Sequence, residues 1–181
     1  MARSTRTRIL DGALDLLRAE GGGSVTLDAA ARQAGLTKPG LMYHFPTKEA
    51  LKLGIVDHVA ARWEEMLLDR LGGPLEDASP HQRTRAYVEV ALTAPFDRAD
   101  YAVCTDALYR DAFHQMWERR FEPWLLLPDD LPDQDRARLT AARLLADGYW
   151  TAAATDVFPV LERDRAELVA ITDDLLRDES P

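Results

Sequence analysis

The glycine at position 35 separates two short stretches of helix-favouring sequence, and this break constrains the fold more than any other feature of the chain. Thr26 is a suitable N-cap for a first helix that runs almost to Gly35, and Thr37 is a suitable N-cap for a second. Lys38 and Pro39 then occupy the first turn of the second helix, where a proline removes no helical hydrogen bond. Two short helices joined by a tight turn with glycine at the joint are typical of the helix-turn-helix motif.

The nine residues Leu36–His44 are typical of the helix that enters the major groove of DNA in such a motif. Gly40 leaves the start of this helix bare, so the helix front can approach a phosphate backbone closely. Tyr43 and His44 follow one turn later, and both side chains can reach phosphates or base edges. A surface helical turn with ordinary caps explains the nine residues equally well, so the flanking sequence decides between the two interpretations.

The flanking sequence favours the DNA-binding interpretation. Before the motif, apolar residues at helical spacing predict a helix that ends at the triple glycine of residues 21–23. This glycine run is not a phosphate-binding loop, because no Gly-Lys-Ser/Thr follows it. After the motif, Thr47 caps a further helix whose first residue, Lys48, can bind a second phosphate. Phe45 is expected to fill a small core formed by Leu10, Leu14 and Leu36.

Charge is distributed unevenly along the chain. The whole sequence has a net charge of −9, which alone argues against a nucleic-acid partner. Residues 1–60, however, contain eight Lys or Arg and six Asp or Glu, whereas residues 61–181 contain 14 and 25. The first eight residues include Arg3, Arg6 and Arg8 and no acid, and they are expected to form a basic arm that follows phosphates. An exposed solubilising tail has the same composition.

Residues 5–55 resemble the amino-terminal domain of the TetR family of transcriptional regulators. The most specific part of the resemblance runs from Ala34 to Leu51, with the sequence Ala-Gly-Leu-Thr-Lys-Pro-Gly-Leu-Met-Tyr-His-Phe-Pro-Thr-Lys-Glu-Ala-Leu. The chain departs from the family pattern at Ala30, where a bulkier aliphatic residue is common, and this puts the packing of the second helix in doubt. With Arg6 of the basic arm added, the resemblance implies that DNA is contacted by Thr26, Thr37, Lys38, Pro39, Gly40, Tyr43, His44 and Lys48.

A long helix is expected to follow the motif. Apolar residues recur at helical spacing from Lys48 to about Leu71, and the Gly-Gly-Pro sequence of residues 72–74 stops the helix. Because a helix carries a displacement along its length, this one can act as a lever between a distant site and the DNA-contacting residues.

The remaining sequence is also helical. No strand pattern or repeat is present, and helical spacing predicts helices over residues 80–94, 97–107, 109–124, 133–156 and 160–177. The expected fold class is therefore all-α. A helix-turn-helix DNA-binding domain is expected over residues 1–50, and a larger helical domain for effector binding and dimerisation is expected over residues 51–181.

An aromatic stripe over residues 109–124 can line a cavity for a small apolar or aromatic molecule, although ordinary core packing has the same spacing. The resemblance favours a cavity, because TetR-like proteins bind an effector among their carboxy-terminal helices. The candidate effector-binding residues are Trp63, Tyr87, Tyr109, Phe113, Trp117 and Tyr149.

Polar residues of the same segment do not predict a metal site. Asp111, His114 and Glu118 share a helix face, but they include a single imidazole and have arginines as neighbours, which is typical of a solvated polar edge. No metal and no cofactor is expected.

The two carboxy-terminal helices are the expected dimer interface. Each has apolar residues on more than one face, which is more than a helix needs to cover its own core. A helix-turn-helix protein also gains from a dimer that places two recognition helices about 34–36 Å apart on a palindrome. A charge at Val169 or Leu176 is therefore expected to yield monomers. The alternative is a monomer in which these helices only pack on the aromatic stripe.

These observations predict a homodimeric regulator that binds a palindromic, double-stranded operator and is released by a small-molecule effector of unknown identity. Repression is the usual case in the family that it resembles. No apolar run approaches the roughly 18 residues of a membrane span, and no signal-peptide core is present, so a cytoplasmic protein is expected. The single cysteine, Cys104, excludes an intramolecular disulfide and a cysteine-based zinc cluster.

Two alternatives to this function are an effector-independent DNA-binding protein, in which the aromatic stripe is filled core, and an enzyme that uses the aromatic cavity as its active site. The enzyme has little support in the sequence, because neither a nucleophile elbow nor another catalytic constellation is found.

Overall fold

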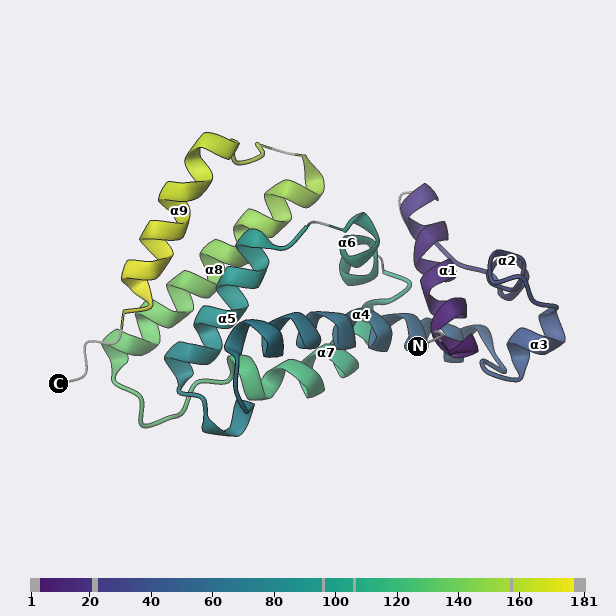
Figure 1. Ribbon diagram of the computed structural model, residues 1–181, viewed down its shortest axis with the longest axis horizontal. Coiled ribbons are helices and arrows are strands. Elements are labelled where there is room, and N and C mark those ends of the chain that lie inside the picture. Colours follow the sequence, from purple (N-terminus) through teal and green to yellow (C-terminus); the bar gives the residue numbers. More distant parts are fainter. Residues whose placement is uncertain (1–3, 21–22, 96, 106, 157, 178–181) are drawn as a thin grey trace. The chain divides into compact units, whose positions relative to one another are not determined.

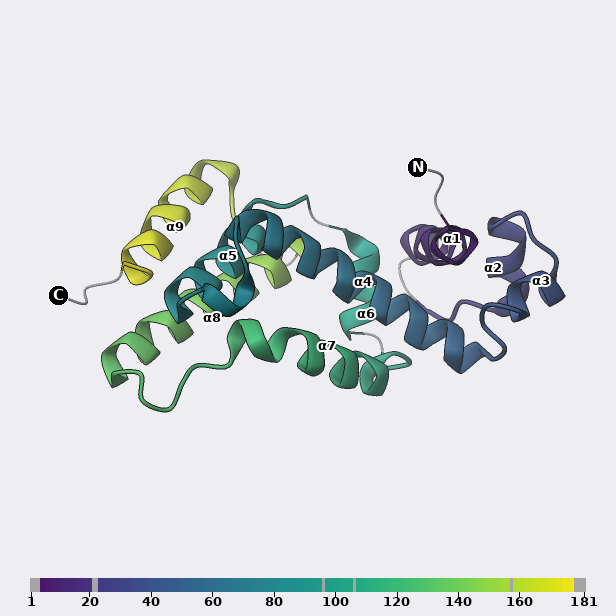
Figure 2. The same ribbon diagram turned by 60° about the horizontal axis from the view of Figure 1, so that its bottom comes forward.

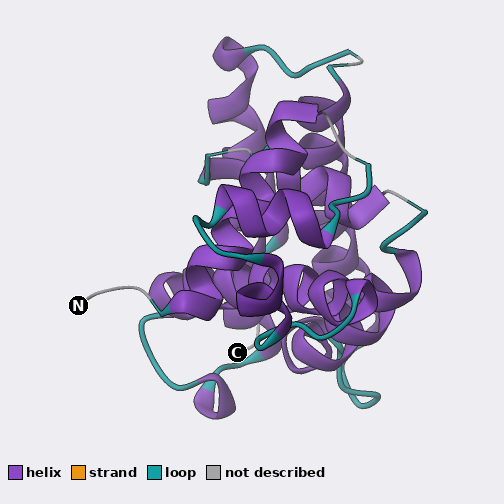
Figure 3. Cartoon of the chain, turned by 90° about the vertical axis from the view of Figure 1, so that its right-hand side faces the viewer, coloured by secondary structure: helices purple, strands orange, loops and turns teal. Residues whose placement is uncertain are grey.

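A computed structural model describes residues 4–20, 23–95, 97–105, 107–156 and 158–177 of the chain. These residues form helices and loops and contain no strand (Figure 3), which confirms the expected all-α class. The α-helices are α1 (Thr5–Glu20), α2 (Leu27–Gln33), α3 (Lys38–Met42), α4 (Lys48–Leu71), α5 (Pro80–Thr93), α6 (Arg98–Thr105), α7 (Arg110–Leu125), α8 (Asp133–Thr155) and α9 (Glu162–Leu175).

Several helices begin where the local sequence provides a cap. Thr26 caps α2, Thr37 caps α3, and Ser79 forms a capping box with Gln82 at the start of α5. The expected helical segments are therefore confirmed, with differences of a few residues at their ends. None of the helices in the described ranges is both long and apolar enough to cross a membrane.

The chain divides into two compact units, which are described separately. The first unit comprises Met1–Arg62 and Asp97–Arg119, and the second comprises Trp63–Phe96 and Arg120–Pro181. Helix α4 starts in the first unit and ends in the second, and so does α7.

In the first unit, α1 and α2 pack closely because the residues at their crossing are small. Ala30 and Ala31 are 0% and 2% exposed, and a Cβ atom added to Gly12 of α1 would lie 2.9 Å from Cγ of Gln33. A larger aliphatic residue at Ala30 would separate these helices. Ala30 departs from the family pattern, but its small side chain lets α1 and α2 pack closely. The second helix is therefore well packed.

Phe45 is 2% exposed and packs against the first half of α4. A Cβ atom added to Gly54 would lie 2.6 Å from Cε1 of Phe45 and 3.3 Å from Cδ2 of Leu10. The ring thus occupies the small core expected from the sequence, next to Leu10, while Leu36 is only half-buried. This contact ties the end of the helix-turn-helix segment to α4.

In the second unit, α5, α8 and α9 pack against one another (Figure 1). Arg85 of α5 donates to the backbone oxygen of Leu176 at 3.0 Å, and Arg138 of α8 donates to that of Leu175 at 3.1 Å. Leu176 is 2% exposed. The expectation that Leu176 belongs to an exposed dimer face is therefore wrong, because its own unit already covers this side chain.

Candidate nucleic-acid interface and effector cavities

The turn between α2 and α3 is a complete Schellman motif. Gly35 has a φ of 67°, and its N–H donates to the backbone oxygen of Arg32 at 3.0 Å. The N–H of Leu36 donates to the backbone oxygen of Ala31 at 2.8 Å. A side chain with a Cβ atom is strained at this positive φ, which explains the glycine between the two helices.

The prediction of a basic arm at the amino terminus is wrong for the residues that the structure describes there, because nearly all of them are helical. Helix α1 already starts at Thr5, and Arg8 donates from Nη2 to the backbone oxygen of Ala34 at 2.9 Å. Arg8 therefore caps the carboxyl end of α2 instead of following phosphates. Arg6 is exposed, and its guanidinium carbon lies 5.1 Å from the ring centre of Phe45. Arg3 lies outside the described residues.

Helix α3 (Figure 2) follows α2 directly in the chain. Its start is capped, and its first two residues are exposed. Thr37 accepts a hydrogen bond from the N–H of Gly40 at 3.2 Å, and Thr26 accepts one from the N–H of Ala29 at 3.1 Å. Lys38 and Pro39 are exposed at the first two positions of α3. Thr26 and Thr37 thus place short polar side chains at the starts of α2 and α3, and Lys38 adds a cation at the start of α3.

Lys38 has a partner that its spacing does not reveal. Its Nζ atom lies 2.9 Å from Oδ2 of Asp28 on α2, and both side chains are about half exposed. The pair connects the start of α2 to the start of α3 across the turn. In the sequence Asp28 lies in the first turn of α2, where it favours the helix dipole, and its pairing with a residue ten positions away depends on the folded turn.

Tyr43 and His44 lie just beyond the end of α3, which stops at Met42 and is shorter than the segment expected from the sequence. The side chain of Tyr43 is 88% exposed, and its ring meets that of His44 edge to face at 5.2 Å. The phenol therefore points into solvent and is free to meet another macromolecule. Lys48 is exposed as the first residue of α4, next to the Thr47 cap.

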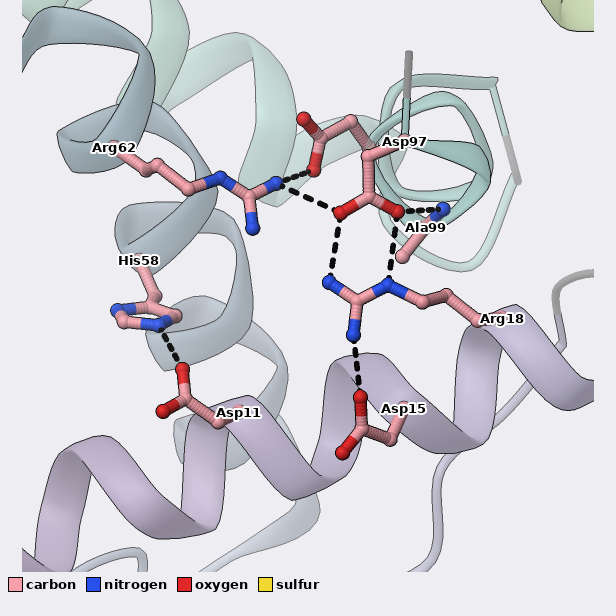
Figure 4. Close-up of polar contacts among 8 residues, drawn as sticks. Asp11, Asp15, Arg18, His58, Arg62, Asp97 and Ala99 are labelled. Atoms are coloured by element: carbon pink, nitrogen blue, oxygen red, sulfur yellow. Dashed lines mark hydrogen bonds and ion pairs between the residues drawn. The ribbon is translucent and has the colours of Figure 1, made fainter. Parts of the chain in front are cut away.

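A network of ion pairs braces α1 against α4 and α6 (Figure 4). Asp97 accepts from Nε and Nη2 of Arg18 at 3.0 and 2.7 Å, from Arg62 at 3.2 Å and from the N–H of Ala99 at 2.9 Å. Burial alone would raise the pKa of Asp97, but the hydrogen bonds and positive charge of Arg18, the Ala99 N–H and Arg62 outweigh it, and the pKa is lowered. The sequence does not predict this network, because Arg18 and Asp97 are far apart along the chain.

One further contact extends this network, and a separate pair lies beside it (Figure 4). His58 of α4 lies 2.9 Å from Asp11 of α1, and Arg62 also pairs with Asp100 of α6. Three helices of the first unit are thereby linked through charged side chains as well as through their apolar core.

The six candidate effector-binding aromatics are divided between the two units. In the first unit, Tyr109 is 2% exposed, and the rings of Phe113 and Trp117 stack at 4.7 Å. In the second, Tyr87 donates to Asp147 at 2.6 Å, Trp63 meets Trp150 edge to face at 6.1 Å, and Tyr149 lines a cavity.

The cavity beside Tyr149 lies in the second unit and measures about 230 Å³. Trp150 also lines it, and Arg165 reaches it from α9 while donating to the backbone oxygen of Leu92 at 3.0 Å from Nε. The remaining wall residues are Ala91, Thr93, Ala94, Pro95 and Ala153. Aromatic rings, methyl groups and one guanidinium suit a small aromatic or apolar molecule.

Neither a metal cluster nor a reactive thiol is found in the described part of the chain. It contains no group of three or more His, Cys, Asp or Glu side chains that could bind a metal ion. Burial raises the pKa of the Cys104 thiol, and the negative charge of Asp100 raises it further. A thiol in this state is a weak nucleophile.

Comparisons with known proteins agree with this arrangement. The family model described as "Bacterial regulatory proteins, tetR family" matches residues 9–54, and the one described as "Tetracyclin repressor-like, C-terminal domain" matches residues 81–177. The HTH-type transcriptional regulator RutR of Escherichia coli K12 is 30% identical over 102 residues, which are 55% of this chain and 46% of RutR. The match therefore spans about half the length of that relative.

Solved structures of low sequence identity share the fold. A TetR-family transcriptional regulator from Rhodococcus sp. has a TM-score of 0.70 at 14% identity, covering 96% of this chain and 99% of its own. NalD, the secondary repressor of an efflux pump in Pseudomonas aeruginosa, has a TM-score of 0.57 at 23% identity, covering 94% of each chain. The multidrug binding protein EbrR, solved with imidazole, has a TM-score of 0.62 at 19% identity, covering 99% and 98%. Because one family model covers more than half of the sequence and a second covers the helix-turn-helix segment, this chain belongs to the TetR family of transcriptional regulators.

Proposed function

We propose that this regulator is a homodimeric repressor that binds a palindromic operator and releases it when a small apolar or aromatic molecule binds. The observation that carries the proposal is the exposed surface of α3 and the residue that follows it, where Lys38, Pro39 and the 88% exposed Tyr43 lie. The buried side chains of Leu41 and Phe45 fix this segment to the core. An exposed aromatic ring beside a cation on a capped helix suits contact with a DNA backbone and groove.

The DNA-contacting set in this proposal includes further residues at the starts of helices. Lys48 and Arg6 supply additional positive charge for phosphates. The full set is Arg6, Thr26, Thr37, Lys38, Pro39, Gly40, Tyr43, His44 and Lys48. We assign residues 1–50 to the DNA-binding domain and residues 51–181 to the effector-binding and dimerisation domain, with α4 as the connection.

Dimerisation through α8 and α9 is supported by an exposed stripe without charge. Leu144 is 56% exposed on α8 and Ile171 is 49% exposed on α9. The hydroxyls of Thr151 and Thr155 donate to backbone oxygens of α8 itself, so their O–H groups need no acceptor on a partner. The stripe on α8 consists of Ala137, Ala141, Leu144, Gly148, Thr151 and Thr155.

An effector site in the second unit is supported by the cavity beside Tyr149 and Trp150. The structural neighbour EbrR is a multidrug binding protein, and NalD represses an efflux pump. Proteins of this fold therefore include binders of small molecules and repressors. Of our candidates, Tyr149 has the most direct support because it lines this cavity. Tyr87 donates a hydrogen bond to Asp147, which is close to Tyr149 on α8.

The proposed release mechanism uses α4 as a lever. This helix has 24 residues, so at about 1.5 Å per residue it extends about 36 Å and belongs to both units. The Asp97 network joins Arg62 of α4 to Arg18 of α1, so a tilt of α4 moves the recognition helix with it. An effector that favours the tilted state by about 1–3 kcal/mol weakens operator binding roughly 5- to 150-fold.

A fluorescence-anisotropy titration tests the proposal. The purified protein is titrated against duplexes that flank its own gene, at two salt concentrations, with a random duplex as control. We expect one flanking segment to bind far more tightly than the random duplex, with an affinity that falls steeply with salt. Equal and weak binding to every duplex, including a genomic fragment library, would contradict operator recognition.

A further inference from the structure

The first unit contains a cavity of about 420 Å³ beside the start of α4. Three segments of the chain form its walls. Ser24 and Val25 come from the loop before α2, and Leu108 and Tyr109 come from the segment before α7. The third segment is the start of α4, which supplies the preceding residue Thr47 and then Lys48, Glu49, Leu51, Lys52 and Ile55. Its volume lies within the range of about 300–1,000 Å³ that is typical of small-molecule sites.

The floor of this cavity is apolar. Leu51 and Ile55 are each 1% exposed, Tyr109 is 2% exposed and Val25 is 7% exposed, so these side chains are firmly positioned by the core. Leu108 also lines the cavity and is 49% exposed, so part of its side chain faces solvent. An apolar body that enters the cavity leaves water and contacts a wall that is already rigid.

The rim of the cavity carries more positive than negative charge. Lys48 and Lys52 lie one turn apart on α4 and both line the cavity, whereas the single acid of the lining is Glu49. Glu49 lies 2.8 Å from Nζ of Lys52, which leaves the Lys48 ammonium in excess. The positive end of the α4 dipole has the same sign.

We propose that this cavity binds an amphipathic organic anion, with a flat or branched apolar body on the floor of Leu51, Ile55 and Tyr109 and a carboxylate at the rim of Lys48 and Lys52. This site is separate from the cavity beside Tyr149, because all of its wall residues belong to the first unit.

The position of the cavity has a consequence that rests on the proposed function. Thr47 and Lys48 line the cavity, and Lys48 belongs to the set assigned to DNA phosphates. A carboxylate on Lys48 and a phosphate on Lys48 exclude each other. The anion therefore competes directly with the operator, without any tilt of α4.

The binding test uses 2-naphthoate as the probe, measured by isothermal titration calorimetry on the full chain without DNA. The neutral analogue 2-naphthalenemethanol has the same ring system without the charge. We expect saturable 1:1 binding of 2-naphthoate and weaker binding of the alcohol. No binding of 2-naphthoate, or equal affinity for the two molecules, would overturn the proposal.

Two variants and a control locate the site. Leu108→Glu places a negative charge at the opening and is expected to weaken 2-naphthoate binding about tenfold or more, and Lys52→Gln is expected to weaken it about 2- to 5-fold. Ala153→Trp fills the other cavity and is expected to leave the affinity unchanged. If Leu108→Glu and Lys52→Gln both bind like the wild type, or if only Ala153→Trp loses binding, the site is elsewhere.

Competition is measured separately as the fold-change in operator affinity on adding 2-naphthoate. One fixed concentration, chosen to saturate the wild type, is used for every variant. The wild type is expected to lose affinity, and Ala153→Trp is expected to lose as much. Leu108→Glu is expected to lose little operator affinity on adding 2-naphthoate. Each variant is compared with itself in the absence of 2-naphthoate, which removes any direct effect of the new charge on DNA binding. Operator binding that 2-naphthoate does not weaken overturns the competition, whereas 2-naphthoate binding without any operator binding contradicts the proposed function and supports the site.

Discussion

Tyr43 illustrates how little of the proposed DNA-contacting surface serves the fold. Its side chain is 88% exposed, whereas Leu41 and Phe45 on either side are 0% and 2% exposed. The buried neighbours hold the backbone in place, and Tyr43 contributes almost no buried area itself. Substitutions at such a position separate binding from stability.

Replacing Tyr43 with Ala is therefore expected to weaken operator binding about tenfold or more while leaving the thermal unfolding midpoint unchanged. Anisotropy titration and circular dichroism measure the two quantities. Lys38→Ala serves as a parallel variant for phosphate contact. Wild-type affinity in both variants would refute the assignment of α3 as the recognition helix.

Replacing Asp28 is expected to strengthen operator binding, in contrast to the replacements of Tyr43 and Lys38. Its carboxylate lies 2.9 Å from Nζ of Lys38, where it neutralises a cation assigned to DNA. Asp28→Asn is expected to strengthen operator binding about 2- to 5-fold at low salt, because Lys38 then meets phosphate without a competing carboxylate. The gain should shrink as salt rises. A loss of affinity at low salt would show that the pair positions Lys38 instead of competing for it.

At the scale of elements, α4 is held at Gly54 and at Arg62 by two different kinds of contact. Gly54 lets the Phe45 ring lie directly on the helix backbone, and Arg62 joins the network around Asp97 (Figure 4). The first contact is apolar and insensitive to pH, whereas the second depends on an ionised carboxylate.

Gly54→Ala is expected to lower the free energy of unfolding by about 1–3 kcal/mol, although alanine is the better helix former, because the new methyl group would lie 2.6 Å from Cε1 of Phe45. Chemical denaturation measures the loss. In a Phe45→Leu background the penalty should be smaller, since the clashing ring is gone. An equal penalty in both backgrounds would mean that the ring does not cause it.

Asp97→Asn is expected to lower the free energy of unfolding at pH 7 by about 1–3 kcal/mol, because Arg18 and Arg62 lose their shared charged acceptor. The folded protein lowers the pKa of Asp97 below its ordinary value of 3.8, so the stabilisation is complete above that value and is lost as the pH falls through the lowered pKa. The difference between wild type and variant should therefore be constant from pH 7 to about pH 5 and shrink below about pH 4.

Denaturant titrations across this pH range test the expectation for Asp97. Asp15→Asn is a matched control, because Asp15 also pairs with Arg18, at 2.5 Å, but its side chain is 55% exposed. This control should cost well under 1 kcal/mol. A difference for Asp97→Asn that stays constant down to pH 3 would exclude the carboxylate charge as its source.

At the scale of the whole molecule, function in this proposal requires two copies of the chain. The exposed Leu144 and Ile171 lie on α8 and α9 of the second unit, whereas the DNA-contacting residues lie in the first. Separate surfaces for pairing and for DNA allow each to be disrupted without the other.

Leu144→Asp and Ile171→Asp are expected to convert a dimer into monomers, because a carboxylate buried in an apolar interface is unpaired. Multi-angle light scattering gives the mass directly. Ala166→Asp is the control, because Ala166 is exposed on a different face of α9, and it should stay dimeric. If both interface variants remain dimeric, the dimer interface does not include Leu144 and Ile171. Leu176→Asp is unsuitable here, since it would unfold the second unit.

The sequence by itself determined the local features of this protein. Caps, glycines and apolar spacing depend on neighbours within a few residues, so the helices from α1 to α9 and the turn at Gly35 could be predicted from them. The family was indicated by the resemblance of residues 34–51 to the TetR pattern. The burial of Phe45 was predicted from the size of its ring, and the exposure of Tyr43 from its place with the bare front of the recognition helix.

Only the tertiary structure decided which distant side chains meet. Arg8 caps α2 instead of forming an arm, Lys38 pairs with Asp28, and Leu176 is core instead of interface. The Asp97 network and the cavity beside Lys48 each combine segments that are far apart along the chain. Such contacts depend on how helices cross, and helical periodicity specifies which face of a helix is apolar but not which neighbour covers it.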